Sequence, residues 1–339
     1  MRKHTLQISF LLIFSLAATF AGAQKEDTRH STIFEQLTTE EGVELTLETD
    51  LTTFIGQKKT NNYVAGSLLT KGGKSYQVEI RPRGRYRRKV SQIPPMKLRF
   101  LEKDLLTDGL DSLNEIKIAL PAFDSDQGNE LIVKEYLAYR LFEKLSDAHF
   151  RARLIKLTIK DTFDPKSKPK KMYAIFVEDE EEVAARLGGV PDDEFGIPID
   201  QYDTRQAALV AVFEYLIGNT DWEFGMHRNV ELIRMKESGK IMVLPYDFDF
   251  SGLVSAPYAS PSSESGLKNV RERYLMRSGL DTDALKEAVK TIKLAEKDLY
   301  QICRSKFLSK STSGDMADFL EIFFKNMKDK DEAPVMMKN

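Results

Sequence analysis

The sequence has a single cysteine, Cys303, and only four histidines among its 339 residues. One cysteine excludes a disulfide within the chain and a zinc site built on several thiolates. An excess of one charge sign is also missing, because 50 Lys and Arg residues nearly balance 52 Asp and Glu residues. Bulk charge therefore gives no reason to expect a nucleic-acid partner, and any basic surface must be local. The composition, 42% hydrophobic and 10% aromatic, excludes a disordered chain.

Long apolar runs are also scarce. The longest, Ile8 to Phe20, follows Met1-Arg2-Lys3 and precedes Ala21-Gly22-Ala23. A positive start, a short apolar stretch and small residues before a cleavage point predict a signal peptide over residues 1–23. The run is too short to span a bilayer comfortably, and no later stretch is a candidate span. We expect an exported protein, soluble after cleavage near Ala23, in a bacterial periplasm or outside the cell, where disulfides are permitted but not required.

Alternation of apolar and polar residues predicts a β-rich first half. The expected strands are Val43 to Leu47, Tyr63 to Leu69, Ser75 to Ile80, Met96 to Phe100, Glu115 to Leu120, Leu154 to Ile159 and Met172 to Val177. One helix, about Asn129 to Leu145, interrupts them. The acidic run Glu178 to Glu182 marks a change of composition, so we place a lobe boundary there. The expected domains are residues 24–178, β-rich with one packed helix, and residues 179–339, mainly helical.

Helical periodicity dominates the second half. Thr204 to Ile217 is apolar nearly all round after Gln206, which predicts a core helix with Gly218 as its C-terminal stop. A hairpin of two strands, Asn229 to Met235 and Lys240 to Leu244, is expected next. Two amphipathic helices are expected at Thr282 to Phe307 and Met316 to Met327.

One carboxylate lies on the apolar side of the Asn129–Leu145 helix. Glu135 falls in the arc that contains Leu131, Ala138 and Phe142. Burying a charge is costly unless it is paired, so we expect Glu135 to meet a Lys or Arg.

Two further carboxylates follow the apolar run Ile241 to Leu244. If the strand continues, Asp247 and Asp249 point to the same side, because side chains alternate with a period of two. Such a pair repels itself unless protons or a cation intervene. The flanking Tyr246, Phe248 and Phe250 favour burial, so we interpret the pair as Mg²⁺ ligands rather than an exposed acidic turn.

A polar loop joins the core helix to the hairpin. It holds Gly218-Asn219-Thr220-Asp221-Trp222 and then His227-Arg228-Asn229. Polar loop residues held between rigid elements are frequent catalytic positions. Asp221 could accept a proton or orient a hydroxyl, with a loop cap as the equal alternative, and Asn229 could give an amide oxygen to a cation. His227 could be a base or a phosphate contact, but an ordinary turn role is favoured.

Basic residues concentrate between Arg81 and Lys103, with nine of them against one acidic residue. The segment is either a solvated loop or a phosphate-binding face, and a nucleic-acid patch is disfavoured by the balanced net charge. Lys97 lies in a strand-like stretch upstream of the helix with Glu135. A strand lysine paired with a helix glutamate sets the phosphate-binding lysine in protein kinases.

Taken in order, these parts resemble a kinase-like fold, and in detail the exported spore-coat protein H (CotH) kinase-like family. The resemblance covers roughly Leu45 to Gly252. It rests on Arg83-Gly84-Arg85 with Lys97-Leu98-Arg99-Phe100, on Lys134-Glu135-Tyr136-Leu137-Ala138-Tyr139-Arg140-Leu141, on Gly218-Asn219-Thr220-Asp221-Trp222 with Asn229, and on Pro245-Tyr246-Asp247-Phe248-Asp249.

The resemblance implies a bilobal atypical protein-kinase-like fold that is α+β. It implies ATP or another nucleotide, bound with Mg²⁺ or Mn²⁺, and an unidentified acceptor, with an envelope protein among the candidates. By position, Lys97 would contact the phosphates and Glu135 would hold Lys97. Asp221 would be the catalytic acidic residue. Asn229 and Asp247 would bind the metal, with Asp249 as a second ligand or structural partner.

The sequence departs from kinases in having no Gly-x-Gly-x-x-Gly loop and in the eight-residue spacing between Asp221 and Asn229. Arg83 or Arg85 could contact phosphate in place of Lys97. A non-catalytic envelope module that binds an anionic ligand or a protein partner is the alternative function. A phosphoesterase or nuclease using Asp247, Asp249 and His227 is less favoured, because a histidine-rich metal cluster is missing.

Overall fold

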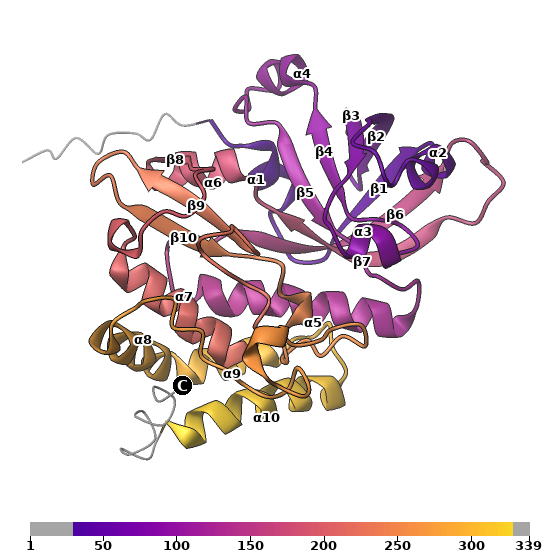
Figure 1. Ribbon diagram of the computed structural model, residues 1–339. Coiled ribbons are helices and arrows are strands. Elements are labelled where there is room, and N and C mark those ends of the chain that lie inside the picture. Colours follow the sequence, from indigo (N-terminus) through magenta and orange to yellow (C-terminus); the bar gives the residue numbers. More distant parts are fainter. Residues whose placement is uncertain (1–29, 328–339) are drawn as a thin grey trace, which may run out of the picture.

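A computed structural model describes residues 30–327. The predicted signal peptide and the tail after Lys328 lie outside the described residues. A β-rich lobe sits above a mainly helical lobe (Figure 1), and each lobe has its own hydrophobic core. The α+β, two-lobed architecture expected from the sequence is confirmed. Between residues 30 and 327, no helix combines the length and apolar character needed to cross a bilayer.

Seven strands close into a barrel in the order β1-β2-β3-β4-β5-β7-β6. They are β1 (Val43–Thr49), β2 (Val64–Thr70), β3 (Ser75–Pro82), β4 (Met96–Phe100), β5 (Glu115–Ala119), β6 (Ala152–Asp161) and β7 (Lys170–Val177). Neighbouring strands run antiparallel except β1 and β6, which are parallel. The period-two alternation turns Leu45, Leu47 and Ile80 into the barrel core.

Short helices flank the barrel: α1 (Ile33–Leu37), α2 (Leu51–Gly56), α3 (Arg87–Val90) and α4 (Glu102–Thr107). Helix α3 forms inside the basic segment, which the sequence did not predict to be helical. It lies on the face of the molecule that looks onto the helical lobe (Figure 1).

Helix α5 (Asp126–Glu143) lies between the barrel and the other helices (Figure 1). It begins where the Ser125 hydroxyl accepts the N–H of Gly128 at 3.1 Å. Its apolar side chains share one core with β6, β7 and the helices of the other lobe. Because α5 packs against barrel strands and against the helices of the other lobe, Glu135 in its middle is only 1% exposed.

The helical lobe contains α6 (Glu180–Leu187), α7 (Thr204–Ile217), α8 (Thr282–Leu294), α9 (Glu296–Cys303) and α10 (Lys310–Asn326). It also holds a three-stranded sheet in the order β10-β9-β8, formed by β8 (Gly189–Pro191), β9 (Val230–Met235) and β10 (Ile241–Pro245). Short 3₁₀ turns occur at Ile199–Gln201, Phe248–Phe250 and Ser263–Ser265.

Helix α7 has the bounds expected from the sequence, and Gly218 ends it at φ 65°. The predicted helix Thr282 to Phe307 is wrong as a single element, because Ala295 separates α8 from α9. The acidic run at the expected lobe boundary forms the start of α6, with Asp179 as its N-cap and acidic residues in its first turn. Carboxylates at a helix N-terminus are stabilised by the helix dipole.

Candidate functional site

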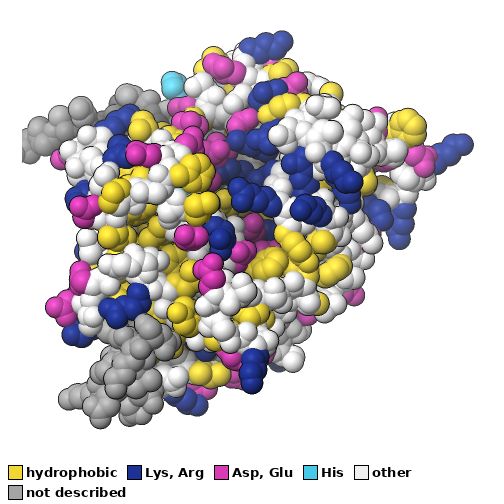
Figure 2. Space-filling view, in the orientation of Figure 1, with side chains coloured by type: hydrophobic (Ala, Val, Ile, Leu, Met, Phe, Trp, Pro, Cys, Tyr) yellow, Lys and Arg dark blue, Asp and Glu magenta, His cyan; other side chains and the backbone are white. Residues whose placement is uncertain are grey.

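A cavity of about 300 Å³ lies where the α3 loop meets the loops of the helical lobe. Its walls combine arginines with acidic and amide side chains. They are Arg83, Gly84, Arg85, Tyr86, Arg87, Pro95, Asp221, His227, Arg228, Asn229, Tyr246, Asp247, Asp249 and Phe250. Figure 2 shows Lys and Arg side chains gathered on this face between the two lobes, with carboxylates beside them. Five predicted site residues meet here: Arg83, Asp221, Asn229, Asp247 and Asp249.

Arg87 is the centre of the charge cluster at the base of the cavity. Its guanidinium makes two hydrogen bonds to Glu135, Nη1 to Oε2 at 2.7 Å and Nη2 to Oε1 at 2.9 Å. Nη2 also binds Asp247 Oδ1, and Nε lies 3.2 Å from Asp249 Oδ2. The expectation that Glu135 meets a Lys or Arg is therefore confirmed.

Burial disfavours the charged forms of the side chains in this cluster. Arg87 and Asp249 are 7% and 4% exposed. Desolvation raises the pKa of Asp249 well above its usual range, despite the opposing pull of Arg87. Burial likewise raises the pKa of Glu135, against the same guanidinium. One cation facing three carboxylates leaves a site that favours an added proton or cation.

The Asp247–Asp249 segment is not the continued strand that the sequence suggested. Strand β10 ends at Pro245, Asp247 has a left-handed backbone at φ 62°, and a 3₁₀ turn follows. Phe248 anchors the turn, with its ring against Tyr139 and Phe213. The Asp247 N–H donates to the Tyr139 hydroxyl at 3.0 Å. Both carboxylates still reach Arg87, because the turn and not strand alternation directs them.

Asp221 and Asn229 form a second pair on the cavity wall. The Asn229 amide nitrogen donates to Asp221 Oδ2 at 3.0 Å and to the Asp221 carbonyl at 2.6 Å. Asn219 accepts the Asp221 N–H at 3.0 Å. Burial, and then the nearby Asp247 carboxylate, raises the pKa of Asp221. The hydrogen bonds hold Asp221 in place, whereas burial and the Asp247 carboxylate make its carboxylate a better proton acceptor.

Asn229 is shaped for this pairing by its backbone, which is left-handed at φ 51°. Its two amide hydrogens point to Asp221, so its side-chain oxygen remains for another partner. His227 also lines the cavity, with Nε2 2.8 Å from the Glu194 carbonyl and its ring against Phe195.

Lys97 does not line the cavity, and its implied pairing with Glu135 is wrong. Its ammonium group binds Glu115, Asp179 at 2.9 Å and Glu180 at 3.6 Å. Burial opposes the charged form, but these carboxylates outweigh it and raise the pKa of Lys97. Lys97 therefore ties β4 to the start of α6, and Arg87 takes the place beside Glu135. The sequence analysis missed Arg87, because the short helix α3 that positions it was not predicted and its neighbours Arg88 and Lys89 are basic as well.

The donor set suits a divalent cation bound together with phosphate. Asp221, Asn229 and Asp247 present hard oxygen atoms to one cavity, and Mg²⁺ commonly takes one or two carboxylates plus phosphate oxygens. No group of three or more His, Cys, Asp or Glu residues in the described range 30–327 is placed to hold a metal by itself. A cation here would need phosphate or the Asn229 oxygen to complete its shell.

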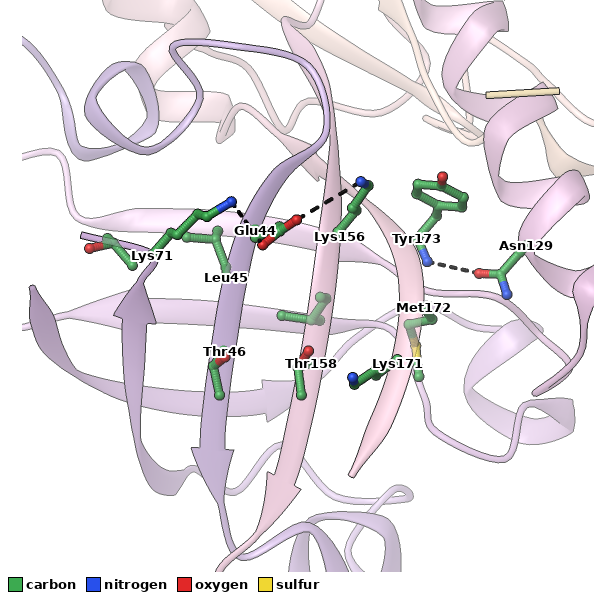
Figure 3. A pocket seen from close by; sticks show the side chains of 12 residues that line it. Glu44, Leu45, Thr46, Lys71, Asn129, Lys156, Thr158, Lys171, Met172 and Tyr173 are labelled. Carbon is green, nitrogen blue, oxygen red and sulfur yellow. Dashed lines mark hydrogen bonds and ion pairs between the residues drawn. The ribbon is translucent and has the colours of Figure 1, made fainter. Parts of the chain in front are cut away.

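A larger groove, about 530 Å³, lies on the outer face of β1, β6 and β7 (Figure 3). Glu44 sits there between two lysines, 3.3 Å from Lys71 and 4.0 Å from Lys156. The Asn129 side chain accepts the N–H of Tyr173 at 2.8 Å at its edge. The groove contains none of the predicted site residues.

No model of a known family matches the chain, and no curated protein matches it. Membership of the spore-coat protein H family therefore stays a prediction. Among solved structures, the chain is similar to the proinflammatory kinase CtkA of Helicobacter pylori, with a TM-score of 0.41, 11% identity, and coverage of 76% of this chain and 94% of that one. It is also similar to the Rio2 kinase of Chaetomium thermophilum in its ADP/Mg²⁺–phosphoaspartate complex, with a TM-score of 0.26, 9% identity, and coverage of 81% and 75%.

Proposed function

We propose that the protein binds a nucleotide with Mg²⁺ or Mn²⁺ in this cavity and transfers the terminal phosphoryl group of the nucleotide to an acceptor hydroxyl. The main support for this proposal is that one cavity is lined both by arginines and by oxygen donors suited to a metal ion. Arg83 and Arg85 come from the barrel lobe, and the oxygens of Asp221, Asn229 and Asp247 come from the helical lobe. Phosphoryl transfer depends mainly on positioning and on charge stabilisation, and these side chains supply both.

Arg83 and Arg85 would contact the phosphates, because Lys97 is held elsewhere by three carboxylates. Guanidinium groups match phosphate oxygens with two parallel hydrogen bonds. Asp247 and Asn229 would hold the metal. A bound divalent ion neutralises charge on the phosphates.

Asp221 would orient the acceptor hydroxyl and take its proton. In that step the acceptor oxygen forms a bond to the terminal phosphorus. The bond from that phosphorus to the bridging oxygen breaks, and the nucleoside diphosphate leaves with the bond pair. The raised pKa of Asp221 favours its role as proton acceptor. An envelope protein is a candidate acceptor if the chain is exported as its sequence predicts.

Calorimetric titration of the protein with ATP, with and without Mg²⁺ or Mn²⁺, tests the proposal. We expect binding that requires the metal and that disappears in the Asp247→Ala variant. Asp193→Ala, an exposed carboxylate that does not line the cavity, is the control and should bind as the parent does. Absence of binding with either metal, in folded protein, would overturn the proposal.

A non-catalytic module for an anionic ligand is the second candidate. The observation in its favour is that Arg87 already neutralises part of the carboxylate cluster. This function predicts binding of inorganic phosphate without metal, weakened by Arg83→Ala and by Arg85→Ala but not by Asp247→Ala. Strict dependence on metal would exclude it.

A further inference from the structure

The loop that joins β6 to β7 projects from the barrel at the right of Figure 1. All residues from 162 to 171 are exposed. Phe163 is among them with 67% of its surface exposed, although burial of a phenyl ring is favourable. We propose that this tip docks the protein on an anionic lipid bilayer, with Phe163 in the interface and the neighbouring lysines on the headgroups.

The hairpin is strongly basic in a chain whose net charge is −2. Six lysines lie between Lys156 and Lys171, against two aspartates. Lys160 pairs with Glu48 and Lys170 with Asp124. Lys156 lies 4.0 Å from Glu44. The remaining three make no ion pair within the described residues: Lys166 and Lys168 in the loop, and Lys171 near the start of β7.

Both aspartates of the hairpin are engaged in building the turn. Asp161 Oδ1 accepts the N–H groups of Leu51 and Phe163, each at 3.0 Å, and Oδ2 accepts the Thr52 hydroxyl at 2.6 Å. Asp164 Oδ1 accepts the N–H of Lys166 at 3.3 Å. Their hydrogen bonds hold the tip in one shape without pairing the free lysines.

The tip is therefore organised before it meets a partner. Asp161 fastens it to α2, and the Ser167 hydroxyl donates to the Asp164 carbonyl at 2.8 Å. Pro165 and Pro169 restrict the backbone further. A preformed surface loses less conformational entropy on binding.

A bilayer uses both features of this tip. Anionic headgroups attract lysines, each of which strengthens binding about fivefold, and an aromatic ring at the headgroup level buries apolar surface. A soluble acidic polymer would use the lysines but would leave the phenyl ring in water. Docking by this tip does not depend on whether the cavity between the lobes binds a nucleotide.

Fluorescence of a Phe163→Trp variant of the full chain tests the proposal at the residue concerned. The native Trp222 is 1% exposed and serves as an insensitive background. We expect a blue shift with phosphatidylglycerol vesicles, quenching by brominated lipid, and neither effect with phosphatidylcholine. Adding Lys166→Ala and Lys168→Ala should weaken the response about tenfold or more.

Phe195→Trp is the matched control. Phe195 is equally exposed, at 65%, but follows the acidic run Asp192-Asp193-Glu194. All variants share the same N-terminus, so differences between them report the substituted position. Three results would overturn the proposal: no quenching at position 163, equal quenching with neutral vesicles, or equal quenching at position 195. The same blue shift with soluble polyglutamate would also overturn it, in favour of an acidic polymer.

Discussion

The Arg87 guanidinium and the Glu135 carboxylate form a two-point ion pair between the barrel lobe and α5, with N–O distances of 2.7 and 2.9 Å. The same guanidinium reaches Asp247 and Asp249 in the loop after β10. Arg87 belongs to the barrel lobe, whereas its partners lie on α5 and on the helical lobe. One side chain therefore fixes the relative positions of the elements that build the cavity.

Arg87→Ala should lower the free energy of unfolding by about 3–5 kcal/mol, because it leaves buried carboxylates without their cation. Urea denaturation measures the loss. Arg85→Ala is the control, since Arg85 lines the same cavity but is exposed and forms no ion pair in the described part of the chain. Its effect should stay within about 0.5 kcal/mol. Equal losses in the two variants would contradict the structural role given to Arg87.

Asp221→Asn should keep metal-dependent nucleotide binding but slow phosphoryl transfer about 100-fold or more, because the amide cannot accept the acceptor's proton. Release of ADP measures turnover, and calorimetry measures binding. Glu223→Gln, two residues along the same loop and outside the cavity lining, should leave both unchanged. A variant at position 221 with undiminished turnover would rule out its role as the proton acceptor.

We expect the free energy of unfolding to fall as the pH rises, because of Glu182. Burial, outweighing the Thr32 hydroxyl bond at 2.5 Å and the attraction of Arg151, raises its pKa to about 7. The folded protein therefore binds this proton more tightly than the unfolded chain, whose glutamate has a pKa of about 4.3. Each pH unit between these values costs up to about 1.4 kcal/mol of unfolding free energy.

Urea midpoints at pH 5 and pH 7.5 measure this dependence, and Glu182→Gln should flatten it. The glutamine is neutral at both values, so it has no proton to lose. Identical slopes in the parent and the variant would show that other carboxylates control the response.

Two helical glycines should respond in opposite directions to alanine. A Cβ on Gly128, in the first turn of α5, would lie 2.0 Å from the Phe123 carbonyl oxygen, so Gly128→Ala should cost about 1–3 kcal/mol. A Cβ on Gly314, in α10, meets nothing within 4 Å. Gly314→Ala should gain up to about 1 kcal/mol from the lower entropy of the unfolded chain. Thermal or urea unfolding of the pair checks both signs, and a stable Gly128→Ala variant would contradict the close approach.

The local sequence pattern was enough to predict the helices and strands that have strong periodicity. The bounds of β4 and α7 match those expected, and the remaining barrel strands differ by a few residues at their ends. The position of Glu135 in an apolar arc also required a basic partner, and it has one. These features follow from side-chain period and the cost of burying charge, which act over a few residues.

The sequence by itself therefore determined the two-lobed α+β architecture, the core helix α7 and the need for a cation beside Glu135. Only the tertiary structure decided that this cation is Arg87, 48 residues away, and that it also binds Asp247, 160 residues away. Lys97 and Arg87 carry the same charge and lie in the same basic segment. The choice between them depends on how β4 and α3 face the helical lobe, and on the left-handed turn at Asp247, which no local pattern specifies.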